Sequence, residues 1–166
     1  MLWFFFDTSA IVKRYHQELG SEIVDGIFES ILKKRSKAII STLSVLEFTS
    51  ALRRKVQTKE INWTQLRDCI GSFLNEVYKN FRVERVDEGL FADSLEYILK
   101  YGLSTLDSLH LVSSIRASEV VAEKSKIVFI SSDEELCKAA EKEGFNVINP
   151  EKERLEAIER LLEKEF

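Results

Sequence analysis

Short, uninterrupted apolar runs separated by longer mixed segments constrain the fold of this chain more than any other feature of its sequence. Leu2–Phe6 and Ile127–Ile130 contain no polar residue, and Ala38–Ile40 is equally apolar. A strand with this composition is buried on both faces, which is the situation in a parallel sheet covered by helices on either side. Strands of this type that alternate with helices therefore predict an α/β fold with a mostly parallel central sheet.

The remaining segments alternate in the same way. Phe81–Val86 and Phe145–Ile148 are predicted as two further strands. We expect one domain over residues 1–166, with a charged C-terminal helix at 150–166 packed on it through apolar residues from Leu155 to Leu162. The other predicted helices cover residues 10–16, 21–33, 42–56, 62–78, 88–101, 105–123 and 132–144.

Composition narrows the class of protein. The 28 acidic residues outnumber the 24 basic ones, which argues against a simple electrostatic binder of nucleic acid. The N-terminus has no basic region, and Leu2–Phe6 is too short to cross a bilayer. Cys69 and Cys137 have neither metal-site nor disulfide spacing. We therefore expect a cytoplasmic protein with free thiols and no membrane contact.

Four acids stand out because each is isolated at or just inside the start of a predicted helix. They are Asp7, Glu47, Asp107 and Asp133, and all four lie in segments otherwise poor in charge. A carboxylate in apolar surroundings is costly unless something pairs with it, and a divalent cation could pair with several at once. Asp7 and Asp133 directly follow predicted strands, at the edge where α/β sheets bind ligands.

Taken singly, three of these acids also have a structural explanation. Asp7 can cap a helix, Asp107 follows Ser104 in a capping-box pattern, and Asp133 suits the dipole of a helix N-terminus. Glu47 resists such an explanation because its helix is apolar over most of its circumference. Four isolated acids together favour a shared cation site. We interpret His110, three residues after Asp107, as a packed histidine.

The combined pattern resembles the PIN domain, most closely the VapC-type toxins of prokaryotic toxin–antitoxin pairs. Each stretch alone is a weak signal, but the stretches occur in the order of the family and cover nearly the whole chain. The matching stretches are Phe6–Ala10, Ser44–Phe48, Leu103–Leu111 and Phe129–Leu136, followed by Gly144 and Val147–Pro150.

The resemblance implies a three-layer fold and a metal-dependent endoribonuclease that hydrolyses RNA. It assigns catalysis and the binding of Mg²⁺ or Mn²⁺ to the four acids already named, with Thr8, Ser9 and Ser131 as supporting polar residues. Mg²⁺ suits this set because it prefers a few carboxylates without His or Cys. Ser9 departs from the asparagine found in many of these toxins. The family also implies a small antitoxin partner and a homodimer.

Two further segments are open to a functional or a structural interpretation. Arg53, Arg54 and Lys55 end the Glu47 helix and either contact RNA phosphates or simply complement the helix dipole. The apolar residues after Gly20 either form a dimer or antitoxin surface or pack on the sheet. These residues are Ile23, Val24, Ile27, Phe28 and Ile31.

Functions from other classes remain open at this level. A phosphatase or phosphotransferase with Asp7 as its nucleophile is one, although the dehalogenase pattern needs an acid where this chain has Ser9 and receiver domains need adjacent early acids. A non-catalytic RNA- or protein-binding module is another, although such modules usually lack one of the acids. Cleavage of RNA that depends on metal, compared with phosphate release or autophosphorylation, discriminates between them.

Overall fold

The protein, described here by a computed structural model over residues 1–121 and 127–163, contains one five-stranded sheet. The strands lie in the order β3-β2-β1-β4-β5, and every neighbouring pair is parallel. The predicted α/β fold with its parallel sheet is therefore confirmed. The strands are β1 (Trp3–Phe6), β2 (Lys37–Ser41), β3 (Phe81–Glu84), β4 (Ile127–Ile130) and β5 (Asn146–Ile148).

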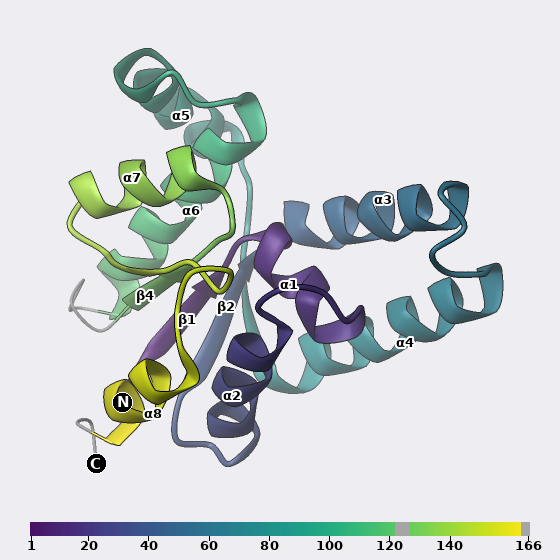
Figure 1. Ribbon diagram of the computed structural model, residues 1–166. Helices are drawn as coiled ribbons and strands as arrows, with labels where there is room; N and C mark the ends of the chain where they lie inside the picture. The colour runs from purple at the N-terminus through teal and green to yellow at the C-terminus, as the bar shows by residue number, and fades with distance from the viewer. Residues whose placement is uncertain (122–126, 164–166) are drawn as a thin grey trace.

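Helices cover both faces of the sheet, as Figure 1 shows. Helices α1 to α4 and α8 contribute to the core on one face, whereas α6 and α7 cover the other and α5 packs on α6. The hairpin of α3 and α4 extends away from the sheet (Figure 1). The helices are α1 (Thr8–Tyr15), α2 (Ser21–Leu32), α3 (Leu43–Gln57), α4 (Trp63–Asn80), α5 (Glu88–Tyr101), α6 (Thr105–Val121), α7 (Glu134–Lys142) and α8 (Leu155–Glu163).

Strand β1 is wholly apolar because both of its faces are buried. Successive side chains of a strand point to opposite faces. Phe4 and Phe6 accordingly join the core beneath α1 and α2, and Phe5 joins the core beneath α6 and α7. The Phe5 ring stacks on Phe129 of β4 with 5.4 Å between ring centroids. Both cores therefore depend on β1, which leads directly into Asp7.

The C-terminal helix begins five residues later than the sequence predicts. The carbonyl of Asn149 accepts hydrogen bonds from the backbone N–H groups of Lys152 and Glu153, so the chain makes a turn before α8 starts. This turn lies against Gly20, which has φ of +84°, and a Cβ on Gly20 would lie 2.4 Å from the carbonyl oxygen of Pro150. The turn thereby holds Glu151 next to α1.

The apolar side of α2 is not a docking surface. All five of its apolar residues named above are no more than 4% exposed, because α2 packs on the sheet and also contacts α8. The interpretation of these residues as a dimer or antitoxin surface is therefore wrong, and their packing on the sheet is confirmed. Across residues 1–121 and 127–163, none of the helices combines the length and apolarity needed to span a bilayer. The predicted helix positions 122 and 123 lie outside the described residues.

Candidate active site

Asp7 lies at the carboxyl end of β1, where the strand order changes direction between β1 and β4. This is the edge at which open α/β sheets bind ligands. Asp7 is only 6% exposed and caps α1. Its Oδ2 accepts hydrogen bonds from the hydroxyls of Ser9 (2.6 Å) and Ser131 (2.9 Å). Residues that follow two neighbouring strands therefore meet at this carboxylate.

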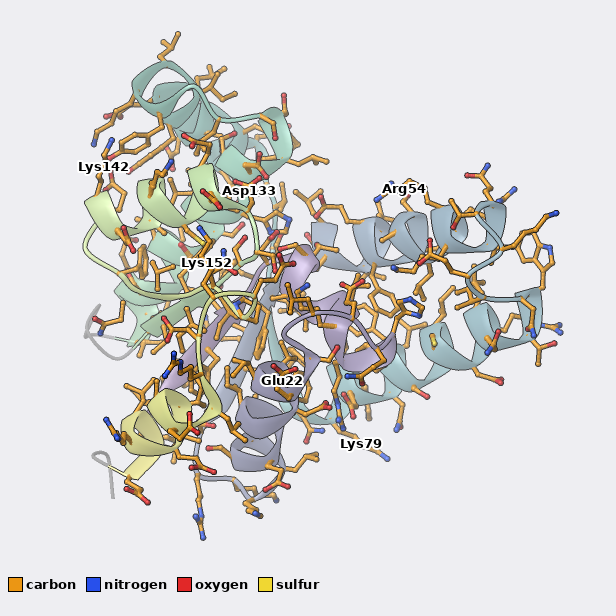
Figure 2. All side chains as sticks on the ribbon, viewed as in Figure 1. Glu22, Arg54, Lys79, Asp133, Lys142 and Lys152 are labelled. Carbon is orange, nitrogen blue, oxygen red and sulfur yellow. The ribbon has the colours of Figure 1, made fainter. Side chains whose placement is uncertain are left out.

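Asp133 is tied to the same edge through Ser131. Its backbone N–H donates to Ser131 Oγ at 3.0 Å, while its own Oδ1 accepts from the N–H of Leu136 at 2.7 Å. Asp133 is thus the N-cap of α7, which starts two residues after the predicted position. The Ser132 N–H also donates to Ser9 Oγ at 2.9 Å. Figure 2 labels Asp133 at the start of α7.

Glu47 reaches this site from α3, and a histidine joins it to Asp7. Its Oε2 accepts from Thr8 Oγ1 at 2.9 Å and is hydrogen-bonded to His110 Nε2. The same His110 nitrogen lies 3.6 Å from Asp7 Oδ1. His110 is 1% exposed, so the expected packed histidine is buried, but it is also a contact residue of two of the four acids. The sequence offered only its position one helical turn after Asp107 as a signal.

The charges around His110 raise its pKa. Burial acts to lower the pKa of His110, but its hydrogen bond to the Glu47 carboxylate and the charges of Asp7, Glu47 and Asp107 outweigh burial, so the pKa is raised. A raised pKa shifts the equilibrium of His110 toward its cationic form. In that form His110 partly compensates the charges of Glu47 and Asp7, which it contacts.

Asp107 lies at the first turn of α6 and completes the group. Its Oδ2 accepts from Ser104 Oγ at 2.6 Å, and its N–H donates back to the same hydroxyl at 3.2 Å. Burial raises the pKa of Asp107, the Ser104 hydrogen bond opposes this, and the charges of Asp133 and Asp7 raise it further. His110 contacts both Glu47 and Asp7, Ser131 joins Asp7 to Asp133, and the charges of Asp7 and Asp133 act on Asp107. We call this group of four neighbouring acids the acid pocket.

Comparison with known proteins identifies the architecture. The model of the family described as the PIN domain matches residues 4–142. The chain belongs to the PIN domain family. Among curated proteins, no sequence matches it.

Three solved structures share this PIN fold at low sequence identity. PAE2754 from Pyrobaculum aerophilum has a TM-score of 0.61 and 18% identity, over 99% of this chain and 89% of its own. VapC20 of Mycobacterium tuberculosis, described as a sarcin–ricin loop cleaving toxin, has a TM-score of 0.60 and 14% identity, over 86% and 95%. A toxin–antitoxin complex from Klebsiella pneumoniae has a TM-score of 0.51 and 13% identity, over 88% of this chain and 96% of its own. At these identities the likeness is one of fold.

The acid pocket of this PIN domain offers the donor chemistry of a magnesium site, namely carboxylate oxygens close to serine and threonine hydroxyls. In the conformation described for residues 1–121 and 127–163, no three side chains of His, Cys, Asp or Glu are yet arranged to hold an ion. One oxygen of each of the four acids accepts a hydrogen bond from protein groups, namely from Ser9 and Ser131, from Ser104, from Thr8, and from the Leu136 N–H. These hydrogen bonds use one oxygen of each carboxylate, so metal binding would need the acids to move closer together but not to lose these partners.

The three basic residues at the end of α3, Arg53, Arg54 and Lys55, have different surroundings. The guanidinium of Arg53 lies 4.9 Å from the ring centroid of Trp63. Lys55 Nζ bonds Glu18 at 3.1 Å and Glu60 at 3.3 Å. Arg54 is exposed, and within the described residues its side chain has no hydrogen-bond or ion-pair partner. These three neighbours, grouped by sequence, thus differ in what they are free to bind.

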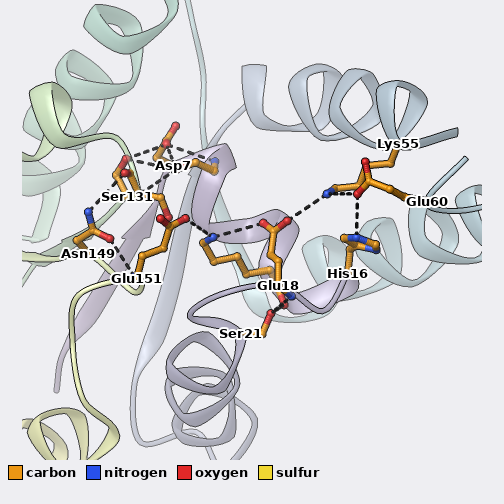
Figure 3. A network of polar contacts seen from close by, with 12 residues as sticks. Asp7, His16, Glu18, Ser21, Lys55, Glu60, Ser131, Asn149 and Glu151 are labelled. Atoms are coloured by element: carbon orange, nitrogen blue, oxygen red, sulfur yellow. Dashed lines mark hydrogen bonds and ion pairs between the residues drawn. The ribbon is translucent and has the colours of Figure 1, made fainter. Parts of the chain in front are cut away.

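A buried lysine that sequence reasoning missed lies close by. Lys13 of α1 is 4% exposed, and its Nζ bonds Glu151 at 2.7 Å and Glu18 at 3.4 Å. Glu18 also forms an ion pair with Lys55, so acids and bases alternate through this group (Figure 3). We call Lys13, Glu18, Lys55, Glu60 and Glu151 the paired cluster. No periodicity in the sequence marks Lys13 as buried, because its partners come from distant segments.

Proposed function

We propose that this PIN domain is a Mg²⁺- or Mn²⁺-dependent endoribonuclease. The single observation that supports the proposal is the proximity of acids from separate segments, among which His110 contacts Glu47 and Asp7 and Ser131 joins Asp7 to Asp133. Four acids from four separate segments are a poor structural device, because like charges destabilise the apo state. Such an arrangement is useful when a divalent cation binds there.

The roles we assign to the acids follow from their positions. Asp7, Glu47 and Asp107 are the proposed metal ligands, direct or through water, and Asp133 helps to bind the ion or to orient a water molecule. A bound ion would supply an activated water and stabilise the leaving oxygen of the phosphodiester. Neither step requires a covalent enzyme intermediate.

The hydroxyls around Asp7 orient the acids. Ser131 Oγ donates to Asp7 and accepts from the Asp133 N–H, so one side chain fixes the spacing of two acids. Ser9 contacts Asp7 Oδ2 and the N–H of Ser132, while Thr8 holds Glu47. Ser9 is shorter than the asparagine expected from the family, and its hydroxyl is already engaged with protein groups. We therefore assign it to positioning Asp7.

We further propose that the protein is the toxin of a toxin–antitoxin pair and acts in the cytoplasm. The fold likeness to VapC20, described as a toxin that cleaves the sarcin–ricin loop, and to a toxin–antitoxin complex supports this proposal. The proposed antitoxin is a small protein that inserts an arginine near Asp7 and Asp133, where charge-assisted hydrogen bonds would compete with metal. The proposed homodimer uses a surface other than the buried side of α2.

The test of the nuclease proposal is incubation of purified protein with labelled RNA and Mg²⁺ or Mn²⁺, with and without EDTA. The wild type should produce defined fragments, and EDTA and Asp7→Asn should each abolish them. RNA fragments that persist at wild-type rates in Asp7→Asn would reveal a contaminant. Intact RNA in every sample, with phosphate release from a small phosphoester, would support the phosphatase alternative instead.

The partner proposals have separate tests. Co-purification with the product of a neighbouring gene, followed by loss of RNA cleavage in the complex, would support the antitoxin. Light scattering at tens of micromolar should give the mass of a dimer, and a strict monomer would remove that part of the proposal without affecting the nuclease.

A further inference from the structure

A polar groove of about 370 Å³ adjoins the acid pocket. Ser9 and Ser132 line it at the end next to Asp7, where Ser9 Oγ lies 2.6 Å from the Asp7 carboxylate. Thr58 and Glu60, which follow α3 in the chain, also line it, and Glu60 is paired with Lys55 of α3. Figure 3 shows the corresponding polar contacts running from Asp7 toward Lys55 and Glu60. The groove is thus an open path that leads away from the proposed reaction site.

Three cations line this groove, but two of them are already neutralised. Lys13 bonds Glu151 and Glu18, and Lys55 bonds Glu18 and Glu60. Arg54 is the third, and its exposed guanidinium has no partner among the described residues. The groove therefore offers one uncommitted positive charge to an incoming anion.

Arg53 provides an internal contrast. Successive helix positions are about 100° apart. Arg53 accordingly lies over Trp63 and is not a lining residue of the groove, whereas Arg54 is. The two arginines share their charge and their helix, and they differ in the surface to which they belong.

We propose that Arg54 binds a backbone phosphate of the RNA strand as the strand leaves the acid pocket along this groove. The proposal rests on the nuclease function proposed above. A guanidinium suits the role because its fork of N–H donors matches phosphate oxygens. The chain carries a net charge of −4, so attraction for RNA must come from local sites of this kind.

The experiment measures binding of a fluorescein-labelled single-stranded RNA of mixed sequence by fluorescence anisotropy over a series of salt concentrations. The proteins carry Asp7→Asn to prevent cleavage, with Arg54→Ala, Arg54→Lys or Arg53→Ala added. Arg54→Ala should weaken binding about tenfold, as expected for loss of one charged hydrogen-bonding group. It should also reduce the slope of log affinity against log salt by about 0.7, the value for one phosphate contact on a single strand.

The two other variants are matched controls. Arg54→Lys should keep the salt slope because it keeps the charge, and Arg53→Ala should keep both the slope and the affinity. Thermal melting checks that every variant is folded. Equal behaviour of Arg54→Ala and Arg53→Ala, or absence of RNA binding in the parent protein, would overturn the proposal.

The nuclease proposal fails by a different result, namely intact RNA after incubation of the wild type with metal. If RNA binds through Arg54 but is never cut, the assignment of Arg54 stands and the nuclease proposal falls. If RNA is cut but Arg54→Ala binds RNA as tightly as Arg53→Ala does, the nuclease proposal stands and the assignment of Arg54 falls.

Discussion

Two groups of charged side chains lie side by side in this PIN domain, and they differ in how far basic residues neutralise the acidic ones. In the paired cluster, Lys13 and Lys55 each bond two carboxylates, and Glu18 is shared between them. In the acid pocket, the described residues supply one basic side chain, His110, for four acids. The paired cluster needs no ligand to be stable. The acid pocket is left short of positive charge, which is the state expected of a site that a cation completes.

The largest contrast should appear in RNA cleavage. Asp107→Asn removes a charge that a bound metal needs, so the cleavage rate should fall by about a hundredfold or more, comparable with loss of one transition-state-stabilising group. Glu151→Gln removes a carboxylate of the paired cluster and should leave the rate within about threefold. Initial rates on labelled RNA at saturating Mg²⁺ measure both. Equal losses in the two variants would erase the distinction between the groups.

Stability should respond in the opposite sense. Lys13→Met keeps the apolar stem but leaves Glu18 and Glu151 without their shared buried cation, so the free energy of unfolding should fall by about 2 kcal/mol. Asp7→Asn should cost little, since an amide oxygen still caps α1 and repulsion in the pocket is relieved. Urea unfolding of the two variants provides the comparison. A larger loss in Asp7→Asn would show that the acid pocket is the stabilising group.

His110 should matter most when metal is absent. His110→Leu removes a basic partner of Glu47 and Asp7, which should destabilise the metal-free protein by about 1–2 kcal/mol. Millimolar Mn²⁺ should return part of this loss, because a bound cation takes over the compensation. Thermal melts of wild type and variant, each with and without Mn²⁺, give the four values required. A loss that Mn²⁺ leaves unchanged would assign His110 to packing alone.

The smallest effect is that of metal on the wild type. An ion at ten times its dissociation constant stabilises the folded state by about 1.4 kcal/mol. For a chain of this size the melting temperature should rise by about 3–5 °C. Glu18→Gln should show the same increment and Asp7→Asn should not. A melting temperature that neither Mg²⁺ nor Mn²⁺ changes would count against a metal site in the folded protein.

The sequence predicted the sheet well because burial on both faces leaves little choice of residue. Ile127–Ile130 is apolar throughout, and the structure places β4 at those bounds. The start of α8 was less predictable. Pro150 is compatible with a first helical position, but Asn149 and the contact at Gly20 hold it in a turn instead. That contact joins residues far apart in sequence, which local patterns do not report.

The site divides in the same way between local and distant information. The four acids could be singled out as candidates because each is isolated in its own segment. Their hydrogen-bond partners could not, since Glu47 meets His110 across 63 positions and Lys13 meets Glu151 across 138. The apolar side of α2 was open to a wrong interpretation as an exposed docking surface. It contacts both the sheet and α8, so its large apolar content reflects double packing and not a free surface.

The central claim is that the acid pocket, and not the paired cluster beside it, binds a divalent cation. Calorimetric titration of Mn²⁺ into wild type, Asp107→Asn and Glu151→Gln tests this claim most directly. We expect saturable binding by the wild type, the same affinity in Glu151→Gln, and a loss of at least about tenfold in Asp107→Asn, as for removal of a coordinating or supporting group. Absence of binding to the wild type, or equal affinity in all three proteins, would contradict the account.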